Sequence, residues 1–164
     1  MKIGIISDTH DHHEHVLAAI DVFNDRRVEY VLHAGDIISP FTAKSFANLK
    51  TARFIAVFGN NEGERPLLRN IISKFGGEIH DNVYKGELGG KKIFMTHTQQ
   101  FLDEVINSRM YDLVIYGHTH TQDIRRVENT LIINPGEATD WISGKSYLVI
   151  LETENMSYEV IPLP

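Results

Sequence analysis

A chain of 164 residues, 42% hydrophobic and 23% charged, is long enough to bury a core and too apolar to be disordered. The absence of cysteine excludes disulfides, thiolate metal ligands and a cysteine nucleophile, and the net charge of -6 disfavours a broad surface for nucleic acid or anionic membrane. No apolar run reaches transmembrane length, and too few residues precede Ser7-Asp8 for a signal peptide. We therefore expect one domain over residues 1–164 in a cytoplasmic protein.

The first half of the sequence alternates short apolar runs with amphipathic segments. Strands are predicted where β-branched runs end in polar residues, at Lys2–Ile6, Val28–His33 and Arg53–Phe58. Capping signals and apolar spacing predict three helices. The first begins at the capping-box pair Asp11 and Glu14, and the second runs from Ser39-Pro40 through about Leu49. The third runs from Pro66 to Gly76-Gly77. This alternation is typical of an α/β protein.

The second half is richer in predicted strands. Gly89-Gly90 predicts a two-residue hairpin between Val83–Leu88 and Lys91–Thr96. A helix is expected from about Phe101 to Arg109. The remaining strands are predicted at Tyr111–Tyr116, Thr121–Glu128, Thr130–Asn134, Lys145–Glu152 and Ser157–Leu163. Strand–helix alternation followed by hairpins indicates a mixed sheet, or two packed sheets, with helices outside.

Side chains that can bind metal follow five of the predicted strands, directly after each strand ends. In α/β sheets ligands bind outside the carboxyl ends of the strands, so these groups should meet in one crevice. Glycine beside Asp36, Asn60 and His118 would let the backbone turn sharply and approach an ion closely. The candidate ligands are Asp8, His10, Asp36, Asn60, His97, His118 and His120.

The number of candidate ligands favours a site for two metal ions. Seven nitrogen and oxygen ligands are too many for one tetrahedral zinc ion, which takes four, but they suit two ions if one carboxylate bridges them. Each aspartate or histidine alone is more simply a turn, cap or surface residue, so the hypothesis depends on their joint position at strand ends. His12, His13 and His15 are predicted on a solvated helix start, with His12 best placed to reach substrate, and His33 is predicted in the core.

Together these motifs resemble the signature of the calcineurin-like metallophosphoesterase superfamily, and their order and spacing are similar to the small, single-domain YfcE-type phosphodiesterases. The matching stretches are Asp8-Thr9-His10, Gly35-Asp36, Gly59-Asn60-Asn61-Glu62, His97 and Gly117-His118-Thr119-His120. The resemblance covers essentially the whole chain. It implies a four-layer α/β/β/α sandwich of two mixed sheets.

The resemblance also implies a role for each side chain. Asp8, His10 and His120 would hold a first metal ion, Asn60, His97 and His118 a second, and Asp36 would bridge both. The catalytic positions would be Asp36, Asn60, Asn61 and His97. A hydroxide between two divalent ions would attack a small phosphodiester. Mn is the first choice of metal, with Ni, Fe, Co, Zn or Mg as alternatives.

Three positions depart from the family pattern. Asn61 stands where phosphatases of the superfamily have a histidine that protonates the leaving group, and asparagine cannot act as an acid near neutral pH. We therefore expect weak turnover or a preference for good leaving groups. Glu62 replaces the usual aspartate, which affects the support of the catalytic group. Thr98 stands where glycine is common and could crowd the second metal.

Two other functions remain open at this point. A phosphomonoesterase would use the same site, and a non-catalytic scaffold would use the same fold to bind partners, as a retromer subunit with this resemblance does. The motifs of P-loop NTPases, zinc peptidases and dinucleotide-binding enzymes are missing from the sequence. A homodimer is expected by resemblance.

Overall fold

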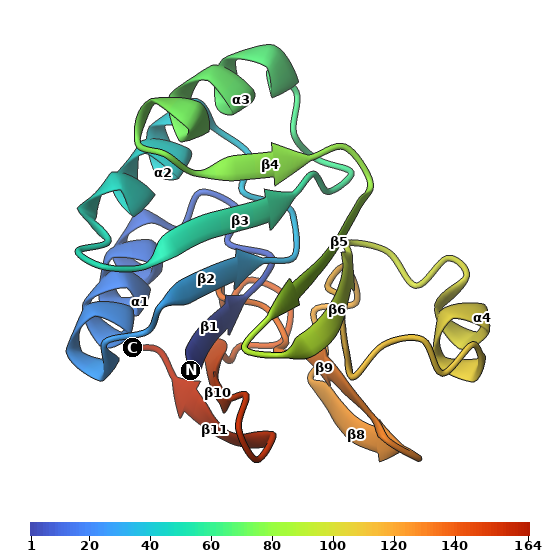
Figure 1. Cartoon of the computed structure of the whole chain (residues 1–164). Coiled ribbons are helices and arrows are strands. Elements are labelled where there is room, and N and C mark those ends of the chain that lie inside the picture. The colour runs from blue at the N-terminus through green and yellow to red at the C-terminus, as the bar shows by residue number, and fades with distance from the viewer.

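Two β-sheets form the centre of the protein, and the computed structural model describes all 164 residues (Figure 1). The first sheet contains β1 (Lys2–Ile6), β2 (Tyr30–His33), β3 (Arg53–Val57), β4 (Glu78–His80), β10 (Tyr147–Glu152) and β11 (Ser157–Pro162). The second contains β5 (Val83–Leu88), β6 (Lys91–Thr96), β7 (Leu113–Ile115), β8 (Asp123–Val127) and β9 (Thr130–Asn134). Their orders are β11-β10-β1-β2-β3-β4 and β5-β6-β7-β9-β8.

Both sheets are mixed, and their parallel strands carry the polar loops. Strands β1, β2, β3 and β4 run parallel to one another, whereas β10 and β11 are joined to them by antiparallel pairing. In the second sheet β6, β7 and β9 are parallel, and β5 and β8 form antiparallel edges. Parallel strands end at the same edge of a sheet, so the residues that follow β1, β2 and β3 lie together, as do those that follow β6, β7 and β9.

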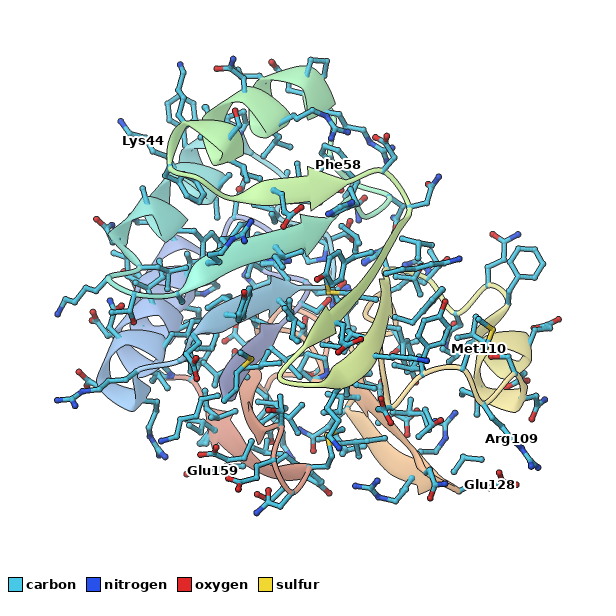
Figure 2. The ribbon with its side chains drawn as sticks, in the orientation of Figure 1. Lys44, Phe58, Arg109, Met110, Glu128 and Glu159 are labelled. Carbon is cyan, nitrogen blue, oxygen red and sulfur yellow. The ribbon has the colours of Figure 1, made fainter.

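Three apolar layers hold the sheets and helices together. Ile3 and Ile5 of β1 belong to the same buried apolar cluster as Ile93 and Met95 of β6. Figure 2 shows that side chains fill the space between the two sheets. Helices α1 (His13–Arg26), α2 (Pro40–Ser45) and α3 (Arg65–Lys74) cover the outer face of the first sheet, and α4 (Leu102–Asn107) covers that of the second (Figure 1). The predicted four-layer α/β/β/α sandwich is confirmed. No helix is both long enough and apolar enough to cross a membrane.

Most predicted elements are present, with ends that differ by one or two residues. The helix predicted to reach Leu49 is regular only to Ser45 and continues as a 3₁₀ turn over Phe46–Asn48. Strand β4 was not predicted, because three residues give no periodic signal and the strand is defined by its pairing with β3. The strand predicted over residues 111–116 is paired only at Leu113–Ile115.

The predicted capping box that begins at Asp11 is wrong. Helix α1 is capped by His12, whose ring Nδ1 accepts a hydrogen bond from the backbone N–H of His15. Asp11 has a φ of 59°, and its carboxylate accepts hydrogen bonds from Ser39 and Thr42 at the start of α2. Asp11 therefore ties the loop after β1 to α2. Ser39 caps α2 as predicted, by accepting from the Thr42 N–H.

The contact between β1 and α1 is tight at Gly4. A Cβ added to Gly4 would overlap with the ring of Phe23, which is buried in α1. We expect Gly4→Ala to lower the free energy of unfolding by about 1–3 kcal/mol through overpacking, measured by urea denaturation. Gly63→Ala is the matched control, because an added Cβ there meets nothing within 4 Å. Equal stability of the Gly4→Ala variant and the parent would contradict this packing.

Candidate metal centre

The first group of predicted ligands lies between the loops that follow β1 and β7. The Nε2 atoms of His10 and His120 are 3.2 Å apart. Asp8 Oδ1 lies 3.5 Å from His120 Nε2 and 3.8 Å from His10 Nε2. Asp8 is fully buried, and the two imidazoles are partly buried. Three atoms with lone pairs thus face one small volume, a spacing that a single cation can satisfy.

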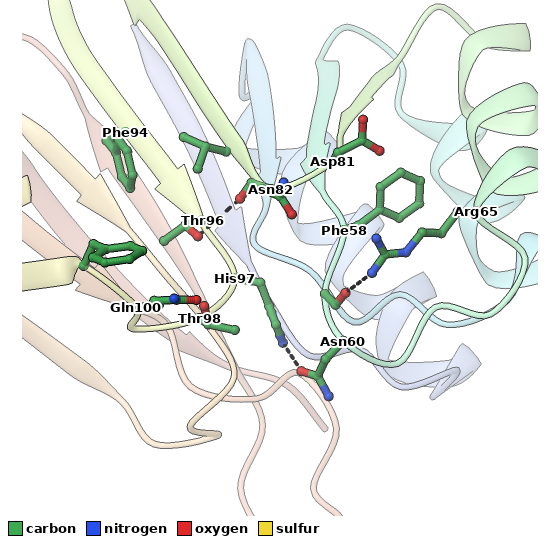
Figure 3. A pocket seen from close by; sticks show the side chains of 13 residues that line it. Phe58, Asn60, Arg65, Asp81, Asn82, Phe94, Thr96, His97, Thr98 and Gln100 are labelled. Atoms are coloured by element: carbon green, nitrogen blue, oxygen red, sulfur yellow. Dashed lines mark hydrogen bonds between the residues drawn. The ribbon is translucent and has the colours of Figure 1, made fainter.

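The second group lies between the loops that follow β3, β6 and β7. Asn60 Oδ1 is 2.9 Å from both His97 Nε2 and His118 Nδ1, and His97 and Asn60 face each other in Figure 3. Asp36 Oδ2 lies 3.4 Å from His97 Nε2. The same oxygen lies 3.5 Å from His10 Nε2 in the first group. Asp36 therefore connects the two groups, and all seven predicted ligands meet in one place.

Neighbouring acceptors orient the imidazoles. His97 Nδ1 lies 2.8 Å from the carbonyl oxygen of Ala34, and His120 Nδ1 lies 2.8 Å from Glu137 Oε2. Because a carbonyl oxygen only accepts, His97 carries its proton on Nδ1 and presents the Nε2 lone pair to the site. A carboxylate has the same effect on His120. This outer support is typical of metal-binding histidines, so the residues present fit divalent ions.

The backbone is strained at the ligands. Asp8, His10, Asp36, His118 and His120 all have φ between 40° and 69°, the left-handed region that costs non-glycine residues energy. The predicted need for neighbouring glycine is also met. A Cβ on Gly59 would overlap with Asp36, and one on Gly117 would overlap with Ser7 and Asp8. Such strain gathers at functional sites, where the surrounding fold enforces it.

The site attracts positive charge. Burial alone would raise the pKa of Asp36, but hydrogen bonds from His97 and Asn61 outweigh it and hold that pKa well below its usual range. A hydrogen bond to Asp8 raises the pKa of His10. Burial lowers the pKa of His97, yet Asp36 and Asp8 reverse this effect and raise it overall. Bound cations would take the place of these protons.

The two residues after Asn60 brace the loops around Asp36. Asn61 donates to Asp36 through its backbone N–H, at 3.0 Å, and through its side-chain amide, at 2.6 Å. Glu62 is buried and accepts hydrogen bonds from the N–H groups of Ile37 and Gly59, at 2.9 and 2.8 Å. Burial raises the pKa of Glu62. The longer side chain at this departure from the family pattern thus joins the loops after β2 and β3.

Two residues that support the site lie where the sequence does not predict them. Glu137, which was not predicted, is fully buried and follows β9, whose end reaches the site because β9 pairs in parallel with β7. The only signal in the sequence is that Glu137 lies three residues beyond the predicted strand Thr130–Asn134. His15 was predicted on a solvated helix start but is buried, with Nδ1 2.8 Å from the carbonyl oxygen of Ala138. His33 is a core residue, as predicted; burial lowers its pKa to about 3.

Trp141 lies beside the first ligand group. Its side chain is 65% exposed, and its ring centroid is 6.4 Å from that of His10 and 6.2 Å from that of His12. The loop that carries it is held by Glu137, which accepts hydrogen bonds from two backbone N–H groups just beyond Trp141. One buried carboxylate therefore fixes both His120 and this loop.

Comparisons with known proteins identify the class. The calcineurin-like phosphoesterase superfamily domain matches residues 1–156. The chain therefore belongs to this superfamily of metallophosphoesterases, which are hydrolases.

Individual proteins and solved structures of this superfamily are similar to the whole chain. A phosphodiesterase from Methanocaldococcus jannaschii is 45% identical over 166 residues, which cover 99% of each chain. The solved structure of an archaeal phosphodiesterase has a TM-score of 0.95 and 44% identity, covering 99% of this chain and all of the other. The E. coli phosphoesterase YfcE shares the fold, with a TM-score of 0.73 and 17% identity over the full length of both chains. The resemblance expected from the sequence is confirmed.

Trp141 offers a direct test of metal binding, since it is the only tryptophan. We expect Mn²⁺, which has unpaired electrons, to quench its fluorescence in the metal-free protein, and closed-shell Zn²⁺ to quench it less. His10→Ala should raise the Mn²⁺ concentration needed for half of the effect at least tenfold, in line with the loss of a ligand. His80→Ala, a histidine variant on β4, serves as the control. Identical titrations for the His10→Ala variant and the parent would contradict the ligand assignment.

Proposed function

We propose that this protein is a phosphodiesterase that uses two divalent metal ions. The observation that carries the proposal is the position of Asp36 Oδ2, within 3.5 Å of the Nε2 atoms of both His10 and His97. One carboxylate oxygen shared by two groups of ligands is what a two-metal site requires. The 45% identity to a full-length phosphodiesterase supports the diester as substrate.

The proposed ligands divide into two sets. Asp8, His10 and His120 would hold one ion, Asn60, His97 and His118 the other, and Asp36 both. When bound, such ions supply a shared hydroxide as nucleophile and neutralise the charge on the phosphoryl oxygens. Two divalent cations outweigh the two aspartates, so the site would attract an anionic ester although the chain is acidic.

The residues of the chain orient this chemistry. Ala34 and Glu137 hold His97 and His120 in the tautomers that face the site, and Asn61 keeps the Asp36 carboxylate in place. The amide of Asn61 cannot supply a proton near neutral pH, so the leaving group must depart without an acid at this position. The enzyme should therefore prefer esters of acidic alcohols and phenols.

The proposal also covers the metal, the substrate and the assembly of the protein. Imidazole and carboxylate ligands without sulfur suit Mn first and also admit Ni, Fe, Co, Zn or Mg. The substrate would be a small phosphodiester, because a protein with a net charge of -6 lacks the basic surface that long nucleic acids require. We expect the protein to act in the cytoplasm. A homodimer is the expected assembly by resemblance.

The Asp36→Asn variant tests the shared ligand. We expect it to lose at least 100-fold in kcat/KM on a chromogenic phosphodiester with Mn²⁺, and to retain less metal after reconstitution, because one substitution weakens both ions. Asp112→Asn is the control, since Asp112 accepts a hydrogen bond from the Lys92 N–H far from the site. Full activity of the Asp36→Asn variant would contradict the proposal that Asp36 bridges the two metal ions.

The same assay separates the alternative functions. The metal-free parent should gain diesterase activity on addition of Mn²⁺ and hydrolyse a matched phosphomonoester more slowly. A faster monoester reaction would instead favour a phosphomonoesterase. No turnover with any divalent metal, while elemental analysis shows bound ions, would favour a scaffold.

Asn61→His tests the missing acid. Histidine can donate a proton near pH 7, so we expect faster cleavage of diesters with poor leaving groups, by about tenfold or more relative to those with good leaving groups. The ratio of the two rates is the proper measurement, because the substitution also removes the hydrogen bond from Asn61 Nδ2 to Asp36. An unchanged ratio would show that proton donation at this position does not limit the rate.

A further inference from the structure

A cavity of about 510 Å³ opens beside the second ligand group (Figure 3). Asn60 and His97, two proposed metal ligands, form one end of it. Its walls come from both sheets, and they include Phe58, Arg65, Asn82, Phe94, Thr98 and Phe101. The volume falls within the range of about 300–1,000 Å³ that is usual for small-molecule sites. The proposed metal chemistry itself leaves this space unused.

One side of the cavity is aromatic. Phe94 is largely buried and contributes to the lining from β6, whereas Phe101 is 64% exposed. Phe101 has a φ of 62° at the start of α4, and its side chain lies outside the core. An exposed phenyl ring on the wall of a cavity offers apolar surface to a planar ligand, which would gain by stacking or edge contact.

The other side of the cavity is polar and carries an unpaired cation. The guanidinium of Arg65 donates to the carbonyl oxygen of Gly59 at 2.7 Å and lies 5.0 Å from the centroid of Phe58, but it forms no ion pair. Asp81, which also lines the cavity, is instead paired with Arg69 at 2.7 Å. The exposed amide of Asn82 lies between Thr96 and Phe58 in the view of Figure 3. These groups suit a ligand with hydrogen-bond acceptors.

We propose that this cavity binds one ester substituent of the phosphodiester, and that the preferred substituent is a nucleoside. A phosphoryl group at the metal ligands would place one of its ester oxygens next to Asn60 and His97, at the end of the cavity. A nucleoside combines a planar ring for Phe101 with carbonyl and hydroxyl groups for Asn82 and Arg65. The inference rests on the proposed phosphodiesterase function and defines its substrate class.

The charge of the protein limits the size of this substrate. With a net charge of -6, the chain lacks the basic surface that a nucleic-acid polymer requires, whereas the cavity has room for a single nucleoside. The substrate class is therefore a diester of one nucleotide with a second alcohol.

Three p-nitrophenyl phosphodiesters with a common leaving group test the inference, namely the methyl, phenyl and thymidine 5′ esters. Hydrolysis transfers the phosphoryl group to water and releases p-nitrophenolate and a phosphomonoester in each case, so kcat/KM reports on the second substituent. With Mn²⁺ we expect kcat/KM to rise about tenfold from methyl to phenyl, and several-fold again to thymidine.

Two variants separate the aromatic and polar contributions. Phe101→Ala should lower the phenyl-to-methyl ratio toward one, and Asn82→Ala should lower the thymidine-to-phenyl ratio. Comparing ratios between parent and variants cancels the intrinsic reactivity of the esters. Tyr158→Ala on β11, which removes another exposed aromatic side chain, should leave both ratios unchanged. Phe101→Leu, which keeps apolar bulk, replaces Phe101→Ala if that variant does not fold.

The outcomes distinguish this inference from the function on which it rests. If none of the three diesters is hydrolysed with any divalent metal, the phosphodiesterase function itself is wrong. If the parent hydrolyses all three with equal kcat/KM, or if both cavity variants keep the ratios of the parent, the function stands and the nucleoside cavity is wrong.

Discussion

The position of the Asp36 carboxylate between imidazoles from the two sheets is the contact on which the site depends. His10 follows β1 in the first sheet and His97 follows β6 in the second, and both Nε2 atoms lie within 3.5 Å of Asp36 Oδ2. A buried carboxylate is costly unless donors or cations surround it. Hydrogen bonds from His97 and Asn61 hold the Asp36 pKa low, so the fold maintains an anion at the junction of the sheets. Divalent cations bound beside Asp36 would complete this arrangement.

The sandwich makes that contact possible by bringing the carboxyl ends of both sets of parallel strands to one edge. A cluster of 16 buried apolar residues packs between the sheets, and the polar groups of the site gather where the strands end. The site in turn imposes strain, since five of the predicted ligands have left-handed backbone. Such residues cost of order 1–3 kcal/mol each and persist only where the surrounding structure holds them. The three apolar layers supply that stability.

Two buried glutamates connect the site to its surroundings in different ways. Glu62 joins the loops after β2 and β3, and Glu137 links His120 to the loop that carries Trp141. The two flanks of the site differ as a result, with an exposed tryptophan beside the first ligand group and a partly aromatic cavity beside the second.

The sequence by itself predicted the candidate ligands, because an apolar run followed by Asp, Asn or His is a local pattern, whereas the four-layer order was implied by the resemblance of these motifs to a known family. It also identified the family from the spacing of those motifs. Only the tertiary structure decided the features that depend on contacts between residues far apart in the sequence. Glu137 reaches His120 only because β9 pairs with β7, and β4 exists only by pairing with β3. Asp11 accepts hydrogen bonds from Ser39 and Thr42 at the start of α2 instead of capping α1, the helix that it precedes. The cavity likewise needs walls from both sheets, and no local pattern encodes the distance between them.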